Sequence, residues 1–366
     1  MEVAPMNTLS DDRDQENRYR DQAPGPLVVV SMWRSGSSLL YALLNKHPQI
    51  ALMYEADLIL LRSAFWNPAR RSDWATRWEF YNEALTRHGL SANELSLQTF
   101  DFWTAFATVH REYARRKGAT IWGDKSTCYD RLNEIAEKFP EARFVIQWRD
   151  PVASANAIAR AAALQDGFFR RRGAKLRGLL GYHALKKEVD RLLARGSAVC
   201  QISYEDLTND PAGTMQKVCG FLQIPYNDDL ANLQGADRSA IHPGEQHTFV
   251  RGDKVVAGPR PQALSPAFRR KAFQYLALWR RQYAGAWPPF PAIDANSIEV
   301  PGLYRRLSDN LAYRSFRAFD AFKGFAFGLA PLSLLGRYRR WRYRENTAQT
   351  SLRRYVLSAL RDKVDD

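Results

Sequence analysis

The sequence predicts an α/β fold, in which a mostly parallel β-sheet carries helices on both faces. Three observations support this prediction. Short apolar runs have the composition of buried strands, helical segments alternate with these runs, and a small-residue turn joins the first strand to the first helix. The chain has 366 residues, 45% of them hydrophobic, which is enough for one large domain with appendages.

The first strand is predicted at Leu27–Ser31, an uninterrupted β-branched run that follows a Pro-Gly-Pro breaker. A helix is predicted over residues 37–46, ending at His47-Pro48. The apolar segment "QIALMYE" then leads to Glu55, and residues 56–116 are helix-rich and aromatic.

The second half of the predicted domain repeats this alternation of strands and helices. The predicted strands are residues 119–126, residues 142–151, which are the clearest in the chain, and residues 197–207. The predicted helices are residues 132–138, a helix from Pro151 to about Leu164, residues 176–193 within a basic segment, and residues 209–224, with Asp210 as the cap and Pro211 in the first turn.

The net charge and the cysteine content limit the possible classes of protein. The net charge of +14 favours polyanionic ligands such as nucleotides, sulfated or phosphorylated glycans, nucleic acid or anionic lipid. The alternative is that this charge only keeps the protein soluble. Three scattered cysteines indicate neither a disulfide framework nor a zinc site, which fits a reducing, cytoplasmic compartment. Residues 1–25 are polar and read as a disordered leader without a signal peptide, and no apolar run is long enough for a transmembrane helix.

The stretch "VVVSMWRSGSSLLYALLNKHP" has the strand–turn–helix form of a phosphate loop without the Walker pattern. It holds one glycine, Gly36, and Arg34 stands in place of a lysine. The N–H groups of the helix start and the hydroxyls of Ser35, Ser37 and Ser38 suit a phosphate. An ordinary strand-to-helix turn would also use serine and glycine, so this alternative stays open.

Three further polar groups follow predicted strands. Arg149 ends the clearest strand, Asp124-Lys125-Ser126 ends the strand before it, and Glu55 follows an apolar segment. Because ligands bind outside the carboxyl ends of parallel strands, these groups are expected to converge with Arg34 at one edge of the sheet. Taken singly, Arg149 could form a surface ion pair with Asp150, and Glu55 could be a cap or a solvated carboxylate.

The combination resembles the sulfotransferases that use 3′-phosphoadenosine 5′-phosphosulfate (PAPS), in particular the tyrosylprotein type and related bacterial enzymes. Four stretches carry the resemblance, in the family's order and across roughly residues 27–290. They are "WRSGSSLLYALLNKHPQI", "GDKSTCYD", "FPEARFVIQWRDPVASANAIAR" and "ISYEDLTNDPAGTMQKVCGFLQIPY". The resemblance implies the P-loop-like sulfotransferase fold and the transfer of a sulfuryl group from PAPS to a hydroxyl by in-line displacement, with no metal required.

The resemblance also implies roles for particular residues. Arg34, with the loop residues Ser35, Gly36, Ser37 and Ser38, would hold the 5′-phosphate and the sulfuryl group. Arg149 would hold the 3′-phosphate that distinguishes PAPS from ADP. Glu55 matches the general base of the tyrosylprotein type, and Lys125 matches a lysine that stabilises the transferring group. Asp124, His47 and His247 remain alternative bases, with His47 favoured as structural.

One position departs from the family's pattern. Where the family usually has a serine eight residues after the 3′-phosphate arginine, this chain has Ala157. Ser154 lies about one helical turn earlier and could reach the same phosphate, and Asn156 is a second candidate. Arg251, in "FVRGDK", is the candidate for the adenine side, and a simple turn is the alternative there.

The predicted domains are a leader (1–25), a sulfotransferase domain (26–300) and a basic, aromatic helical extension (301–366). The extension holds 14 Lys and Arg against six Asp and Glu, a net charge of +8. Residues 316–344 suit a helix at an anionic membrane surface, so the protein could be peripheral at the inner face of the cytoplasmic membrane. Packing on the domain or on a homodimer partner is the alternative.

The resemblance implies an acceptor that carries a hydroxyl, which is a glycan, a lipid or a small molecule. Its pocket is expected in residues 56–116 and 165–196. Two other functions are alternatives. A small-molecule kinase would need the Walker lysine and a magnesium carboxylate, which the sequence does not show. A nucleic-acid-binding or membrane-binding protein would explain the charge, but not Arg34, Lys125 and Arg149 at successive strand ends. The departure at Ala157 leaves open an inactive relative that only binds nucleotide. No nucleic acid is expected as a partner.

Overall fold

The structure, a computed structural model, contains a five-stranded parallel sheet. It describes residues 25–59, 62, 84–90, 95, 101–163, 173–241, 250, 252–256, 262–283 and 296–337. The strands are β1 (Leu27–Ser31), β2 (Ile50–Tyr54), β3 (Ile121–Ser126), β4 (Arg143–Trp148) and β5 (Ala198–Ser203). Their order is β2-β3-β1-β4-β5, and every neighbouring pair is parallel. The predicted α/β class with a parallel sheet is confirmed.

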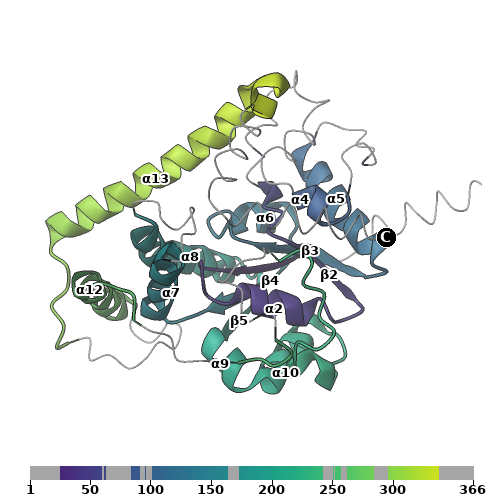
Figure 1. Cartoon of the computed structure of the whole chain (residues 1–366), viewed down its shortest axis with the longest axis horizontal. Helices are drawn as coiled ribbons and strands as arrows, with labels where there is room; N and C mark the ends of the chain where they lie inside the picture. Colours follow the sequence, from purple (N-terminus) through teal and green to yellow (C-terminus); the bar gives the residue numbers. More distant parts are fainter. Residues whose placement is uncertain are drawn as a thin grey trace, which may run out of the picture.

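Helices cover both faces of this sheet, as predicted. Below it in Figure 1 lie α2 (Ser37–Leu44), α9 (Tyr204–Asn209) and α10 (Pro211–Leu222). The other helices are α4 (Ala84–Arg87), α5 (Phe102–Arg116), α6 (Leu132–Lys138), α7 (Pro151–Ala163), α8 (Ala174–Ala194), α12 (Pro266–Gln282) and α13 (Leu303–Leu329), with a short 3₁₀ helix, η4 (Asp228–Ala231).

Strand residues alternate between two cores because successive side chains point to opposite faces. Val28 and Val30 of β1 pack into the core shared with α5, α6, α8 and α12. Leu27 and Val29 pack into the core shared with α2 and α10. All five residues of β1 are buried, which explains why the strand reads as a continuous apolar run in the sequence.

Most predicted boundaries lie within two residues of the observed ones, but the strand predicted over 197–207 is wrong beyond Ser203. The Ser203 hydroxyl accepts the N–H of Asp206 at 2.8 Å and caps α9, so Tyr204–Leu207 is helical. Asp210 caps α10 by accepting the N–H of Gly213 at 2.9 Å, and Pro211 lies in the first turn, as predicted.

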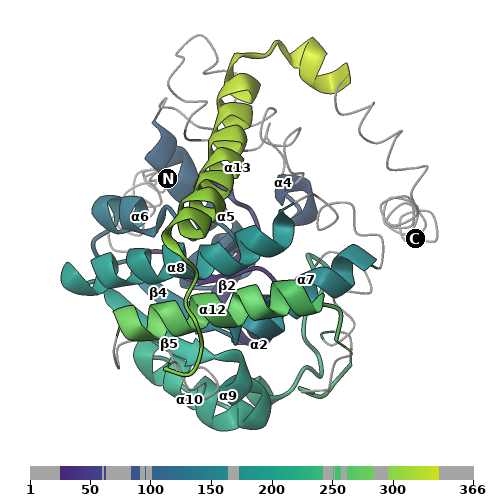
Figure 2. The same cartoon turned by 90° about the vertical axis from the view of Figure 1, so that its left-hand side faces the viewer.

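The long helix α13 lies across α8 on the outside of the molecule (Figure 2). Within the part of the chain that the structure describes, no helix combines the length and the apolar character needed to cross a membrane. Residues 1–24 of the predicted leader and residues 338–366 of the predicted extension lie outside the described residues. The division into a leader, a domain and an extension stays a prediction.

Candidate active site

The turn after β1 is shaped by two residues with left-handed backbone conformations. Arg34 has a φ of 61° and Gly36 has a φ of 87°, after which α2 begins at Ser37. A Cβ atom on Gly36 would lie 2.3 Å from the ring of Tyr204, so close approach and backbone conformation both require glycine. The turn therefore directs its backbone and the start of α2 toward the carboxyl edge of the sheet.

Ser35 and Ser154, predicted on separate grounds, come together in this structure. The Ser35 hydroxyl lies 3.4 Å from the Ser154 hydroxyl and 3.0 Å from that of Tyr182, and Ser154 and Tyr182 are 2.8 Å apart. All three residues are buried. Asn156 accepts the N–H of Ala263 at 2.7 Å instead, so Ser154 is the candidate beside the loop.

Arg149 lies directly after β4 and joins the same turn. Its Nη1 donates to the backbone oxygen of Arg34 at 2.8 Å, and its guanidinium lies 4.1 Å from the centre of the Tyr204 ring. Because Arg149 is only 7% exposed, the alternative of a surface ion pair with Asp150 is excluded. Asp150 accepts the N–H of Val152 at 2.7 Å at the start of α7.

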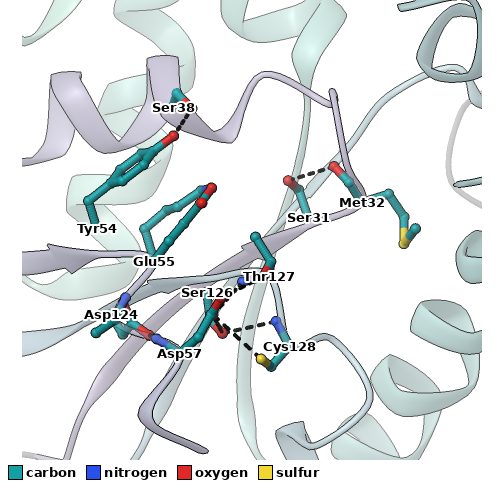
Figure 3. Close-up of polar contacts among 12 residues, drawn as sticks. Ser31, Met32, Ser38, Tyr54, Glu55, Asp57, Asp124, Ser126, Thr127 and Cys128 are labelled. Atoms are coloured by element: carbon teal, nitrogen blue, oxygen red, sulfur yellow. Dashed lines mark hydrogen bonds and ion pairs between the residues drawn. The ribbon is translucent and has the colours of Figure 1, made fainter. Parts of the chain in front are cut away.

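Glu55 and Lys125 form an ion pair at the ends of β2 and β3. The Lys125 side chain is 3% exposed, and its ammonium lies 4.7 Å from the centre of the Tyr54 ring. Tyr54 in turn shares a 2.7 Å hydrogen bond with Ser38 (Figure 3). Burial lowers the pKa of Lys125, but Glu55 and Tyr54 outweigh it and raise that pKa above its ordinary value, so the lysine is charged.

The backbone that carries Glu55 is held in an unusual conformation. Glu55 has a φ of 48° and Asp57 a φ of 45°. Asp124 accepts the N–H groups of Ala56 at 3.2 Å and Asp57 at 3.3 Å, while the Asp57 carboxylate accepts from Thr127 Oγ1 at 2.7 Å (Figure 3). Burial and the nearby Asp57 raise the pKa of Asp124. These contacts give Asp124, one of the alternative bases, a role in fixing the turn.

Of the remaining predicted residues, the structure describes His47, which makes its contacts away from this site. His47 Nε2 donates to the backbone oxygen of Pro225 at 2.9 Å, and its Nδ1 accepts the N–H of Gln49 at 3.1 Å, which is the structural role expected for it. His247 and Arg251 lie outside the described residues. In the segments predicted for the acceptor pocket, the described helices α5 and α8 place apolar residues in the core.

Comparison with models of known protein families identifies the family of this chain. Residues 26–228, more than half of the chain, match the model described as the sulfotransferase family. The chain belongs to the sulfotransferase family. This match spans the loop of Arg34, both ends of the Glu55–Lys125 pair and Arg149, and it confirms the resemblance at the level of the family.

Three proteins that resemble this sulfotransferase share a quarter or less of the aligned sequence with it. Protein-tyrosine sulfotransferase A of Caenorhabditis elegans is 25% identical over 238 residues, 63% of this chain and 57% of its own. The protein-tyrosine sulfotransferase of Drosophila melanogaster is 24% identical over 227 residues, 60% of this chain and 42% of its own. The chain thus spans about half the length of these curated relatives. Among solved structures, the sulfotransferase domain from the curacin biosynthetic pathway aligns over 79% of this chain and 98% of its own, with 16% identity and a TM-score of 0.48.

Several residues at the sulfotransferase site were not predicted from the sequence. Tyr54, Tyr182 and Tyr204 contact the predicted residues but come from separate elements. Gln147 of β4 is fully buried, and neither polar atom of its amide has a hydrogen-bond partner among the described residues. Its Nε2 would lie 3.3 Å from a Cβ on Gly36. A polar residue inside the apolar run "FVIQW" was the available signal for Gln147.

Proposed function

We propose that this protein transfers the sulfuryl group of PAPS to a hydroxyl of an acceptor molecule. Membership of the sulfotransferase family supports this activity over that of a small-molecule kinase. The observation that carries the proposal is the arrangement at the carboxyl edge of β1, β2, β3 and β4. There Arg149 donates a hydrogen bond to the backbone oxygen of Arg34, and Glu55 is paired with the buried Lys125.

Buried donors at this edge fit a nucleotide with several anionic groups. Arg149 Nε and the Gln147 amide are buried without a hydrogen-bond partner in the described chain, and both side chains border the turn at Gly36 or Arg34. Unsatisfied buried donors are rare in folded proteins, and a ligand oxygen would satisfy them. The turn at Arg34–Ser38 would hold the 5′-phosphate, and Arg149 with Ser154 would hold the 3′-phosphate.

The mechanism follows from the positions of Lys125 and Glu55. When bound, PAPS supplies an activated sulfuryl group on a phosphate leaving group. Lys125, charged and water-excluded, would stabilise negative charge near the transferring group, an effect that is strong where the dielectric constant is low. The Glu55 side chain is 23% exposed, and its carboxylate would accept the proton of the acceptor hydroxyl. Such transfers rely on positioning and charge neutralisation more than on covalent chemistry.

The nature of the acceptor is a further part of the proposal. Family membership supports a hydroxyl-bearing acceptor, which we place among glycans, lipids and small molecules. The three cysteines are buried and free, which fits the proposed cytoplasmic location. A homodimer is compatible with these features.

The decisive experiment compares two nucleotides that differ at the 3′ position. Isothermal calorimetry would measure the affinity for 3′-phosphoadenosine 5′-phosphate and for ADP. We expect the first to bind at least about tenfold more tightly, because a charge-assisted contact to Arg149 contributes about 1.5 kcal/mol or more. In Arg149→Ala this preference disappears.

Arg115→Ala is the matched control, since Arg115 is a 70% exposed arginine on α5 and the same charge is removed. It should keep the preference of the wild type. Equal affinity of the wild-type protein for the two nucleotides, or binding of neither, would overturn the proposed co-substrate. Tight binding with no sulfuryl transfer to any of a panel of hydroxyl acceptors would favour the non-catalytic nucleotide-binding relative.

A further inference from the structure

The outer side of α13 is apolar. Its large hydrophobic residues are spaced by three, four or seven positions over most of the helix, so they share one face. We define the α13 apolar face as Leu303, Tyr304, Leu307, Leu311, Phe319, Phe322, Phe325 and Leu329, all of which are exposed. Leu307 is 61% exposed and Leu311 is 70% exposed. Contiguous exposed apolar surface of this kind marks an interaction site.

Polar contacts on the opposite side of α13 fix this orientation. Asp309 accepts hydrogen bonds from Lys271 at 2.9 Å and from Tyr275 at 3.1 Å. Tyr313 and Tyr129 share a hydrogen bond of 2.9 Å, and Arg317 forms an ion pair with Asp130. Turning the apolar face inward would break all of these contacts. These contacts therefore keep the α13 helix in the orientation that leaves its apolar side exposed.

The charge around this face is positive. Arg314, on the same side and near the middle of the helix, is exposed, and Arg337 is exposed at the end of the described chain. The sequence then continues as "YRRWRYR" over residues 338–344, four arginines interleaved with aromatic residues. An apolar helix face joined to a cluster of basic and aromatic residues is typical of segments that bind anionic lipid surfaces.

We propose that the α13 apolar face docks the protein onto the surface of an anionic lipid bilayer. A second copy of the chain explains the observations less well. A two-fold contact between two α13 faces would bring the two exposed Arg314 residues close together, and like charges in a contact repel each other. An anionic bilayer both covers the apolar face and neutralises this charge.

The docking face is joined to the proposed active site through the loop after β3. Tyr129 and Asp130, which hold Tyr313 and Arg317, follow Lys125 within a few residues. This attachment sets the proposed site at a fixed position relative to the bilayer. One consequence, which rests on the proposed function, is that an acceptor carried by a lipid would be presented to Glu55 from the membrane.

Co-sedimentation of the full-length protein with vesicles tests the proposal. One set of vesicles is phosphatidylcholine alone, and the other contains equal parts of phosphatidylcholine and phosphatidylglycerol. We expect the wild-type protein to sediment with the anionic vesicles and much less with the neutral ones. The double variant Leu307→Glu/Phe322→Glu should bind the anionic vesicles at least about tenfold more weakly, because it places charges in the buried part of the contact.

The matched control is Leu193→Glu/Val256→Glu, which adds the same charges at two exposed apolar residues outside the face. It should bind anionic vesicles like the wild type. Equal binding of the two double variants, or no binding of the wild type to either vesicle, would overturn the proposal. So would a wild-type dimer that only Leu307→Glu/Phe322→Glu dissociates while vesicle binding persists. No nucleotide is needed in this assay, so its failure would leave the proposed sulfuryl transfer untouched.

Discussion

At the scale of single residues, backbone strain is concentrated at the candidate site. In the described chain, four residues other than glycine have a positive φ, and three of them, Arg34, Glu55 and Asp57, follow β1 or β2 at this site. Such conformations cost on the order of 1–3 kcal/mol each and persist where surrounding contacts fix them. Here the contacts are the Asp124 carboxylate below Glu55 and the Arg149 guanidinium on the Arg34 carbonyl.

Glu55→Gln should separate the proposed chemistry from binding. The amide keeps the size of the side chain but cannot accept a proton, so turnover with PAPS and a suitable acceptor should fall by about two orders of magnitude or more. Affinity for 3′-phosphoadenosine 5′-phosphate should change little. Steady-state kinetics and calorimetry give the two values. The control is Glu112→Gln, a half-buried glutamate of α5 that is ion-paired with the exposed Arg115. Near-normal turnover of Glu55→Gln would remove Glu55 from the role of base.

At the scale of elements, the ends of strands and the starts of helices build the site. Tyr204, the first residue of α9, packs its ring between Gly36 and the Arg149 guanidinium. Its position depends on the sharp change from strand to helix at Ser203, whose hydroxyl caps α9. The short helix α9 therefore supports the phosphate turn from outside it.

Ser203→Ala should affect both stability and nucleotide binding. Loss of an N-cap costs about 1 kcal/mol of unfolding free energy. Because α9 begins with Tyr204, affinity for 3′-phosphoadenosine 5′-phosphate should also fall by a few fold. Ser265→Ala removes the equivalent cap of α12, where Ser265 accepts the N–H of Phe268 at 3.3 Å. Urea denaturation and calorimetry on the two variants should show similar losses of stability, with weaker nucleotide binding in Ser203→Ala alone.

The parts of the fold that the sequence predicts are those with a local cause. Leu27–Ser31 reads as a buried strand because its own residues are apolar and β-branched, and Asp210-Pro211 reads as a helix start because the cap is local. The segment Tyr204–Leu207 was predicted as part of the strand because a single serine that caps a helix is a weak signal in the sequence. The contacts of Tyr182 and Tyr204 could not be predicted, since they depend on how separate elements pack around the turn.

At the scale of the whole molecule, charge and burial set the response to acid. His110 of α5 is fully buried beside the Phe106 carbonyl, to which its Nδ1 is hydrogen-bonded at 2.7 Å. Burial lowers the pKa of His110 to about 4, from 6.5 for an unperturbed histidine. At pH values between about 4 and 6.5, this histidine binds a proton in the unfolded chain but not in the folded protein. The histidine therefore makes the protein less stable as the pH falls below 6.5.

His110→Phe should weaken that pH dependence. Urea denaturation at pH 7 and pH 5 gives the free energy of unfolding for both proteins. The loss on acidification should be smaller in the variant by about 2 kcal/mol, because its ring cannot take up a proton. The comparison uses only the difference between the two pH values, so a change in packing at this position does not affect it. Identical pH dependence in both proteins would contradict the prediction.

The central place of β1 in the strand order also bears on how the chain is made. Leu27 pairs with Gly123 on one side and with Arg143 on the other, so both neighbours of β1 are synthesised roughly a hundred residues after it. A nascent chain therefore leaves the ribosome with an apolar strand whose two edges are open. We expect chaperone binding during translation to concentrate on this segment until β4 has emerged.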